Sequence, residues 1–207
     1  WNEMKQNAER ISSNPDSGVR QLLDLYAANA RRYGLPSIRW HLVGHSAGAI
    51  VHAHFGAMAV ASGLDLRSAS LIAPAVRIDE FDRTLGRAAL KAGTRLLVAH
   101  LTDAAERADP TSRPYGHSLL YLVSRALEDR GETALLGMER HLVPARATLP
   151  WGALTMAVAS PASDITRLPS ELALDGSAGR STTAATHGTL DDDPALQRLI
   201  LEMIRKA

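Results

Sequence analysis

Residues 42–49 read Leu42-Val43-Gly44-His45-Ser46-Ala47-Gly48-Ala49. They join a short β-branched and apolar run, 38–43, to an alanine-rich stretch, 47–63. The run predicts a strand, bounded by Pro36 and Gly44, and the stretch predicts a helix that ends at Gly63. A Gly-x-Ser-x-Gly pattern between a strand and a helix is typical of a catalytic serine, because the sharp turn lifts the hydroxyl above the sheet.

Each position of this pattern has a physical reason. Ser46 has to adopt a strained backbone so that its oxygen projects from the turn. Gly44 and Gly48 are expected to leave room for the close approach of strand and helix. The backbone N–H of Ala47, at the start of the helix, can point at a developing oxyanion. His45 flanks the nucleophile, where we expect it to contribute to the wall of the pocket.

Strands and helices are expected to alternate along the rest of the chain. The predicted strands are 38–43, 66–73, 95–101 and 151–159, and the predicted helices lie between and around them, at 17–33, 47–63, 79–92, 118–128 and from 194 onward. Asp16 or Ser17 can cap the first helix and Asp193 the last one. The polar stretch 1–16 and the uncertain stretch 131–150 predict no element, and 161–186 predicts a long loop.

This alternation favours an α/β fold, with a mostly parallel sheet and helices on both faces. The 207 residues fit a single domain, 1–207. Because the sequence starts at Trp1, we expect that the chain is truncated at its N-terminus.

Composition and charge exclude several classes of function. The net charge of +1 gives no electrostatic reason to expect binding to nucleic acid. The absence of cysteine excludes disulfides and thiolate catalysis. No apolar run approaches the roughly 20 residues of a transmembrane helix, and no signal peptide is visible, which favours a cytoplasmic location. The abundance of alanine and arginine suggests a bacterial gene.

The elbow sequence Gly44-His45-Ser46-Ala47-Gly48 resembles that of α/β-hydrolase esterases and lipases, and the resemblance extends from about residue 17 to the end. It implies a serine hydrolase that cleaves an ester-like acyl bond of a small or lipid-like substrate through an acyl-enzyme. Nucleophile, acid and histidine would follow in that order, with strands between them. No metal or organic cofactor is implied.

The resemblance places the base in the loop after the last strand. Of the eight histidines, His187 lies there, and Gly188 beside it permits a tight loop. His52 and His54 are two residues apart on a predicted helix and therefore face different directions, which argues against a metal site.

The acid is expected after the third predicted strand. Asp103 stands at the end of that strand, where it could accept the imidazole N–H of the base. Glu106 and Asp109 are alternatives in the same loop, and Asp164 is a weaker one. Asp191 is close to His187 in sequence but is interpreted as charge at the N-terminus of the last helix.

The chain departs from the family pattern in one respect. An α/β-hydrolase usually has eight strands, and four are predicted here. The missing strands would precede residue 1, together with the loop that supplies the second oxyanion donor. The strand before Ser46 would then lie at a sheet edge, and the isolated chain could be inactive.

Two other hypotheses differ in class. The first is a non-catalytic interaction domain that keeps the fold but not the chemistry. The second, a nucleotide-binding domain, is disfavoured because residues 44–48 contain neither a Gly-x-Gly-x-x-Gly fingerprint nor a P-loop lysine. The oligomeric state, the substrate and the second oxyanion donor are not predicted.

Overall fold

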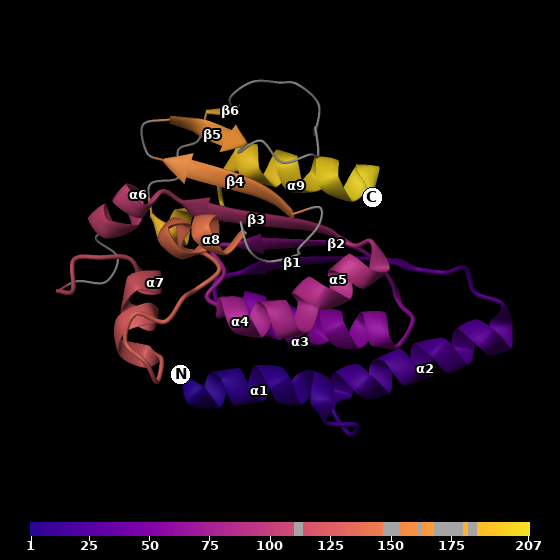
Figure 1. The fold of residues 1–207 in the computed structure, drawn as a ribbon. Helices are drawn as coiled ribbons and strands as arrows, with labels where there is room; N and C mark the ends of the chain where they lie inside the picture. The colour runs from indigo at the N-terminus through magenta and orange to yellow at the C-terminus, as the bar shows by residue number, and fades with distance from the viewer. Residues whose placement is uncertain (110–113, 147–153, 161–162, 168–179, 182–185) are drawn as a thin grey trace.

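The chain folds around a six-stranded sheet in a computed structural model, which describes residues 1–109, 114–146, 154–160, 163–167, 180–181 and 186–207 (Figure 1). The strands lie side by side in chain order: β1 (Arg39–His45), β2 (Asp65–Ile72), β3 (Arg95–Leu101), β4 (Leu154–Ser160), β5 (Ser163–Arg167) and β6 (Arg180–Ser181). The first four run parallel, whereas β5 and β6 pair antiparallel. The predicted α/β class with a mostly parallel sheet is therefore confirmed.

The register of the parallel strands gathers their carboxyl ends at one edge of the sheet. His45, the last residue of β1, lies opposite Ile72 of β2, which in turn lies opposite Ala99 of β3. Every residue of β3 after Arg95 is buried, as expected of a central strand covered on both faces. The loops that leave this edge therefore converge, and Ser46 is the first residue of one of them.

Helices cover both faces of the sheet, as predicted (Figure 1). One face carries α3 (Gly48–Ala61) and α5 (Arg87–Ala92), with α1 (Asn2–Ser13) packed on α3, and the other carries α9 (Pro194–Lys206) against β2 and β3. Alternate residues of β3 serve the two faces: Leu97, Ala99 and Leu101 pack toward α9, and Leu96 and Val98 toward α3. Each face thus has its own apolar core.

Several predicted helix ends are confirmed. The Ser17 hydroxyl accepts the N–H of Arg20 at the start of α2 (Gly18–Tyr33), and Gly34 closes that helix with a left-handed φ of 59°. The Asp193 carboxylate accepts the N–H groups of Ala195 and Leu196 at the start of α9. These caps satisfy donors that a helix cannot satisfy by itself.

Other predictions need correction. The stretch 1–16 contains α1, and the loop 161–186 contains β5 and β6. The stretch 131–150 contains α8 (Glu139–Arg146), and the chain after β3 continues into α6 (Asp103–Ala108). The predicted helix 118–128 consists of α7 (Leu119–Leu122) and a π-helical turn, η3 (Val123–Leu127).

The predicted helix 79–92 is divided in a similar way. Its parts are α4 (Ile78–Phe81), the π-helical turn η1 (Asp82–Gly86) and α5. Thr84 has a non-helical backbone within η1, and its hydroxyl donates to the carbonyl oxygen of Glu80 at 2.6 Å. A threonine side chain that bonds one turn back disturbs a helix in this way.

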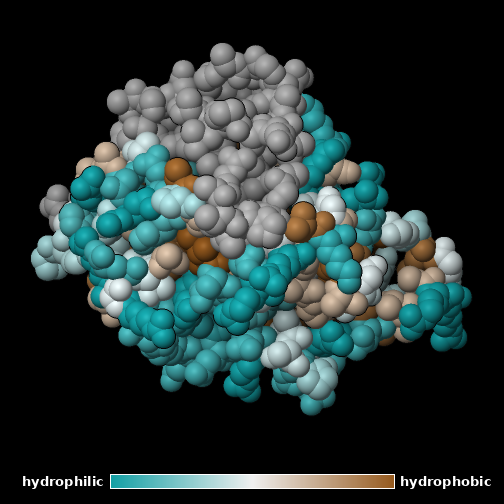
Figure 2. All heavy atoms as spheres, in the orientation of Figure 1, coloured by the Kyte–Doolittle hydropathy of each residue, from teal (hydrophilic) through white to brown (hydrophobic). Residues whose placement is uncertain are grey.

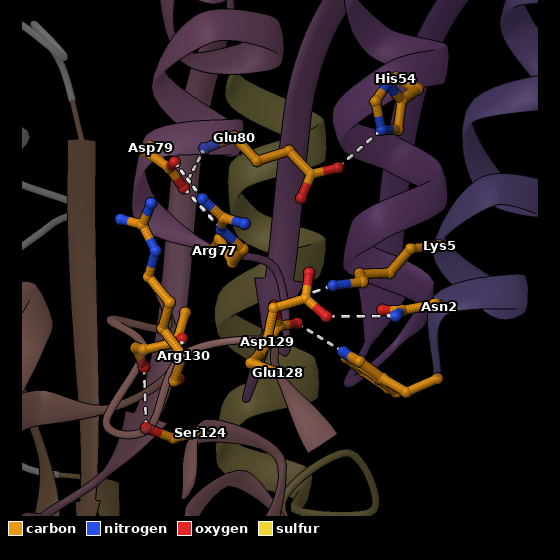
Figure 3. A network of polar contacts seen from close by, with 12 residues as sticks. Asn2, Lys5, His54, Arg77, Asp79, Glu80, Ser124, Glu128, Asp129 and Arg130 are labelled. Atoms are coloured by element: carbon orange, nitrogen blue, oxygen red, sulfur yellow. Dashed lines mark hydrogen bonds and ion pairs between the residues drawn. The ribbon is translucent and has the colours of Figure 1, made fainter. Parts of the chain in front are cut away.

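Polar contacts fix α1 beside the loop that follows η3 (Figure 3). The Glu128 carboxylate accepts hydrogen bonds from the Trp1 indole and, at 2.8 Å, from the Lys5 ammonium. Next to it, the Asn2 amide donates to Asp129 at 3.2 Å. Because Glu128 is buried, its charge needs these donors, and they hold the first helical turn in place.

The face of the molecule shown in Figure 2 is mainly hydrophilic over the described residues, with scattered hydrophobic patches. Among these residues, none of the helices combines the length and the apolar character that crossing a bilayer would require. The largest exposed apolar side chains include Leu22, Leu25 and Tyr33 of α2, which contacts little besides α1.

Candidate active site

Ser46 stands at the turn between β1 and α3 with a left-handed backbone. Its φ is 53°, a value that costs a non-glycine residue about 1–2 kcal/mol. Three hydrogen bonds hold this conformation: the Ser46 N–H donates to the carbonyl of Ile72 at 2.8 Å, and the Ser46 carbonyl accepts from Ala49 at 3.1 Å and Ala75 at 3.0 Å. The sharp, strained turn expected from the sequence is present.

The two glycines of the elbow have different roles. A Cβ atom on Gly44 would lie 2.4 Å from Cδ2 of His52 and 3.2 Å from the backbone carbon of Gly48. His52 has little freedom to yield, because its Nε2 is hydrogen-bonded to the Val43 carbonyl at 3.0 Å. A Cβ on Gly48 would meet no atom within 4 Å. The expectation of close packing thus holds for Gly44 and is wrong for Gly48.

The start of α3 supplies backbone donors beside the serine. The Ala49 N–H is the donor that bonds back to the Ser46 carbonyl, so the N–H groups of Ala47 and Gly48 precede the first bond of the helix. α3 has 14 residues, and its dipole adds positive potential at this end. The position of Ala47 therefore suits the role of oxyanion donor expected from the sequence.

His187 meets Ser46 across 141 residues of sequence. Its Nε2 lies 2.9 Å from the Ser46 Oγ, which is within hydrogen-bonding distance. The ring lies on a short 3-10 turn, His187–Thr189, which a reciprocal pair of hydrogen bonds between Thr186 and Thr189 closes. The pair of nucleophile and base proposed from the sequence is therefore brought together.

The environment of His187 keeps its ring neutral. Burial, aided by the positive charge of His45, lowers the pKa of His187 to about 4, against smaller opposing effects of Asp109 and Asp191. At neutral pH the unprotonated Nε2 can therefore accept the hydroxyl proton of Ser46. In that tautomer Nδ1 carries the hydrogen, and this atom is buried without a hydrogen-bond partner.

The acidic group bound to His187 is Asp109 and not Asp103. The Asp109 carboxylate accepts the backbone N–H of His187 at 2.7 Å and is almost fully buried. The Asp103 carboxylate instead accepts the Tyr121 hydroxyl at 2.6 Å and pairs with Arg107 at 3.0 Å. The structure thus favours the alternative Asp109 over the first choice, Asp103.

The reason for this difference is α6. Thr102 caps this helix by accepting the N–H of Ala105, so Asp103 lies in the first turn and Asp109 at the C-terminal end. The helix carries the chain past Asp103 before it returns toward His187. A capping threonine followed by an acidic first turn is a helix-start signal that could have revealed this.

Glu106, the other alternative, is buried in a different contact. One carboxylate oxygen accepts the Ser118 hydroxyl, and the other oxygen is buried without a hydrogen bond. Burial raises the pKa of Glu106 to about 8, with Asp109 and Asp103 adding to the rise and the Ser118 bond opposing it. Glu106 is therefore protonated at neutral pH.

The remaining candidates lie elsewhere. His54 pairs with Glu80 at 2.8 Å, and His100 is fully buried in β3 with its Nδ1 against a backbone carbonyl. Asp164 lies in β5, and its side chain is not among those that the structure describes. His45, expected in the pocket wall, contacts the His187 loop. Among the described residues, no three histidine or acidic side chains converge as a metal site would require.

A charged pocket of about 940 Å³ opens between the segments 77–83 and 128–134. None of Ser46, Asp109 or His187 lines it. Several of its side chains are already paired, including Arg77 with Asp79 (Figure 3). This pocket is therefore separate from the candidate catalytic residues.

We expect Gly44→Ala to destabilise the chain by about 1–3 kcal/mol, because the new methyl group would overlap the His52 ring. The matched variant Gly48→Ala should be neutral or stabilising by up to about 1 kcal/mol, because alanine is more favourable than glycine within a helix by about that amount. Urea denaturation of the three proteins measures the difference. Equal stability of the two variants would contradict the packing assigned to Gly44.

Glu106 should make stability depend on pH. Its pKa in the folded chain, about 8, lies above the ordinary 4.5, so the folded state binds more protons between these values. The free energy of unfolding should therefore fall as pH rises from about 4.5 to about 8. Glu106→Gln removes this effect. We expect the free energy of unfolding of the variant, minus that of wild type, to be about 2–4 kcal/mol greater at pH 9 than at pH 5.

Chemical denaturation at the two pH values tests this expectation. The control is Glu9→Gln, which removes an exposed charge from the surface of α1. Its effect on stability should be small and the same at both pH values. A Glu106→Gln variant with the same pH dependence as wild type would refute the assignment.

Comparison with known proteins does not identify a family for this chain. No protein family model matches the chain, and neither the curated proteins nor the solved structures contain a significant match. The chemistry is therefore inferred from Ser46, His187, Asp109 and the backbone around them.

Proposed function

We propose that this protein is a serine hydrolase that cleaves an ester-like acyl bond. The observation that carries the proposal is the 2.9 Å approach of His187 Nε2 to the Oγ of Ser46, a residue held in left-handed backbone at a strand-to-helix turn. A structural serine needs neither that strained backbone nor a buried neutral imidazole at its hydroxyl. A nucleophile with its general base needs both.

The proposed reaction has two halves. The Ser46 oxygen attacks the acyl carbon while His187 takes its proton, and the negative charge on the acyl oxygen faces the N–H of Ala47. His187 then returns the proton to the departing alcohol, which leaves an acyl-enzyme. In the second half, water gives its proton to His187 and attacks the acyl carbon, and Ser46 recovers the proton as the acid leaves.

Asp109 is proposed as the third member of the site. Its carboxylate already holds the backbone of His187, and its charge favours the imidazolium that forms during each half of the reaction. Catalytic hydrogen bonds often reach their full geometry only with substrate bound. A bond from Nδ1–H to Asp109 is therefore assigned to the reacting complex.

The chemistry of the site supports attack on an acyl carbon, after which the alcohol departs with one proton. The same pair of serine and histidine can serve lipase, thioesterase, peptidase and acyltransferase chemistry, so a small or lipid-like acyl ester is proposed from the resemblance of the elbow alone. The alternative of a non-catalytic interaction domain predicts a serine that does not react, so reactivity separates the two.

A fluorophosphonate probe should label Ser46 in the intact chain, because the probe traps serines that an adjacent base activates. Mass spectrometry should locate the adduct on Ser46, and Ser46→Ala and His187→Asn should abolish it. The exposed Ser62→Ala is the matched control and should label like wild type. A folded wild-type chain that stays unlabelled would favour the interaction domain.

Asp109→Asn should lower kcat for a short p-nitrophenyl ester by about 10²- to 10⁴-fold. Asparagine keeps an oxygen for the His187 N–H but loses the charge that stabilises the imidazolium. Asp103→Asn should cost less than about tenfold, since its partners are Tyr121 and Arg107. If the Asp103 variant proves the more damaging one, the acid has to be reassigned.

A further inference from the structure

His45 bridges the elbow and the loop that carries the base. Its Nε2 lies 3.1 Å from the carbonyl oxygen of His187. A carbonyl oxygen can only accept, so Nε2 carries a hydrogen and donates it. The hydrogen bond joins the residue directly before the nucleophile to the backbone of the base.

The other side of the His45 ring faces an acidic group. Nδ1 of His45 lies 3.6 Å from Oδ2 of Asp191, which follows the turn of His187. The second oxygen of Asp191, Oδ1, is buried without a hydrogen bond, while the side chain as a whole is 40% exposed. The two imidazole rings also pack together, with centroids 5.0 Å apart and a tilt of 35°. Asp191, His45 and the His187 carbonyl thus form a continuous chain.

Charge provides a second link between the two histidines. The positive charge of protonated His45 opposes the protonation of His187, whereas Asp109 and Asp191 favour it. These three groups are the charges that act on the His187 ring, and they come from three elements: the elbow, the end of α6 and the turn before α9. We therefore expect removal of the His45 charge to raise the pKa of His187, besides any effect on its position.

We propose that His45, supported by Asp191, is a positioning residue that holds the His187 loop against the elbow, so that the imidazole faces the Ser46 hydroxyl. The proposal rests on the hydrolase function proposed above. It assigns His45 an action through His187 and not on the substrate. Displacement of a base by about 1 Å can lower a rate by about 100-fold, so the bridge matters for turnover more than for binding.

Two variants separate position from charge. His45→Ala removes both the hydrogen bond and the charge, and we expect kcat to fall by about 10- to 100-fold with KM within about twofold. His45→Gln keeps an amide N–H for the His187 carbonyl and should recover most of kcat. The control His54→Gln removes a histidine of α3 that pairs with Glu80 of α4, and it should behave like wild type.

The pH profile provides a readout that a purely structural role would not move. The acid limb of kcat/KM should shift to higher pH in both His45 variants, because the charge that opposes protonation of His187 is gone. Asp191→Asn should shift it the other way. An unmoved acid limb, or a His45→Gln variant no better than His45→Ala, would overturn the proposal.

An NMR titration of the His187 ring gives an answer that does not depend on turnover. In His45→Gln the midpoint should rise relative to wild type, and an unchanged midpoint would overturn the coupling. If the wild-type chain is not labelled by the fluorophosphonate probe but this midpoint rises, the hydrolase function fails while the link between the two histidines stands.

Discussion

The left-handed backbone of Ser46 is the constraint on which the site depends. A φ of 53° costs this residue about 1–2 kcal/mol of conformational energy, and hydrogen bonds to Ile72, Ala49 and Ala75 hold the backbone there. Two of these partners belong to β2 and the loop after it, so the turn exists only when β1 and β2 are paired. Gly44 completes the arrangement, because any side chain at that position would meet the His52 ring. The strain is thus maintained by the sheet and not by the turn alone.

Burial sets the charge states around this turn. The same desolvation that keeps His187 neutral at pH 7 keeps Glu106 protonated. Were Glu106 ionised, its buried charge would be repelled by Asp109 and Asp103, which both raise its pKa. Protonation of Glu106 removes that repulsion. A carboxylic acid that looks unused in the mechanism therefore contributes to the electrostatics of the site.

The sequence predicted the parts of this fold whose signals are local. The sharp turn at Ser46, the caps Ser17 and Asp193, and the strand 95–101 depend on neighbouring residues, and the structure contains all of them. The choice of His187, after the last predicted strand, came from the resemblance of the elbow to that of α/β-hydrolases. By contrast, α1 was missed because its place depends on Glu128, a residue distant in sequence that binds Trp1 and Lys5.

The acidic partner of His187 could not be chosen from the sequence. Asp103, Glu106 and Asp109 all carry a carboxylate within seven residues, and only the path of α6 shows which of them reaches His187. Asp103 accepts the Tyr121 hydroxyl, Glu106 is buried against Ser118, and Asp109 reaches the His187 backbone. Likewise, Asp191 could be assigned to a helix end from sequence, but its contact with His45 requires the fold.

The distance in sequence between Ser46 and His187 has a consequence for the order of assembly. Strands β1 to β4 are neighbours both in the chain and in the sheet, so each can pair soon after it is synthesised. The elbow needs only β1, β2 and α3, and it can form early. His187 arrives 141 residues later, with the turn that leads into the last helix. A growing chain is therefore expected to hold Ser46 in its turn before His187 is made, and the two side chains meet only as the C-terminal helix docks on the sheet.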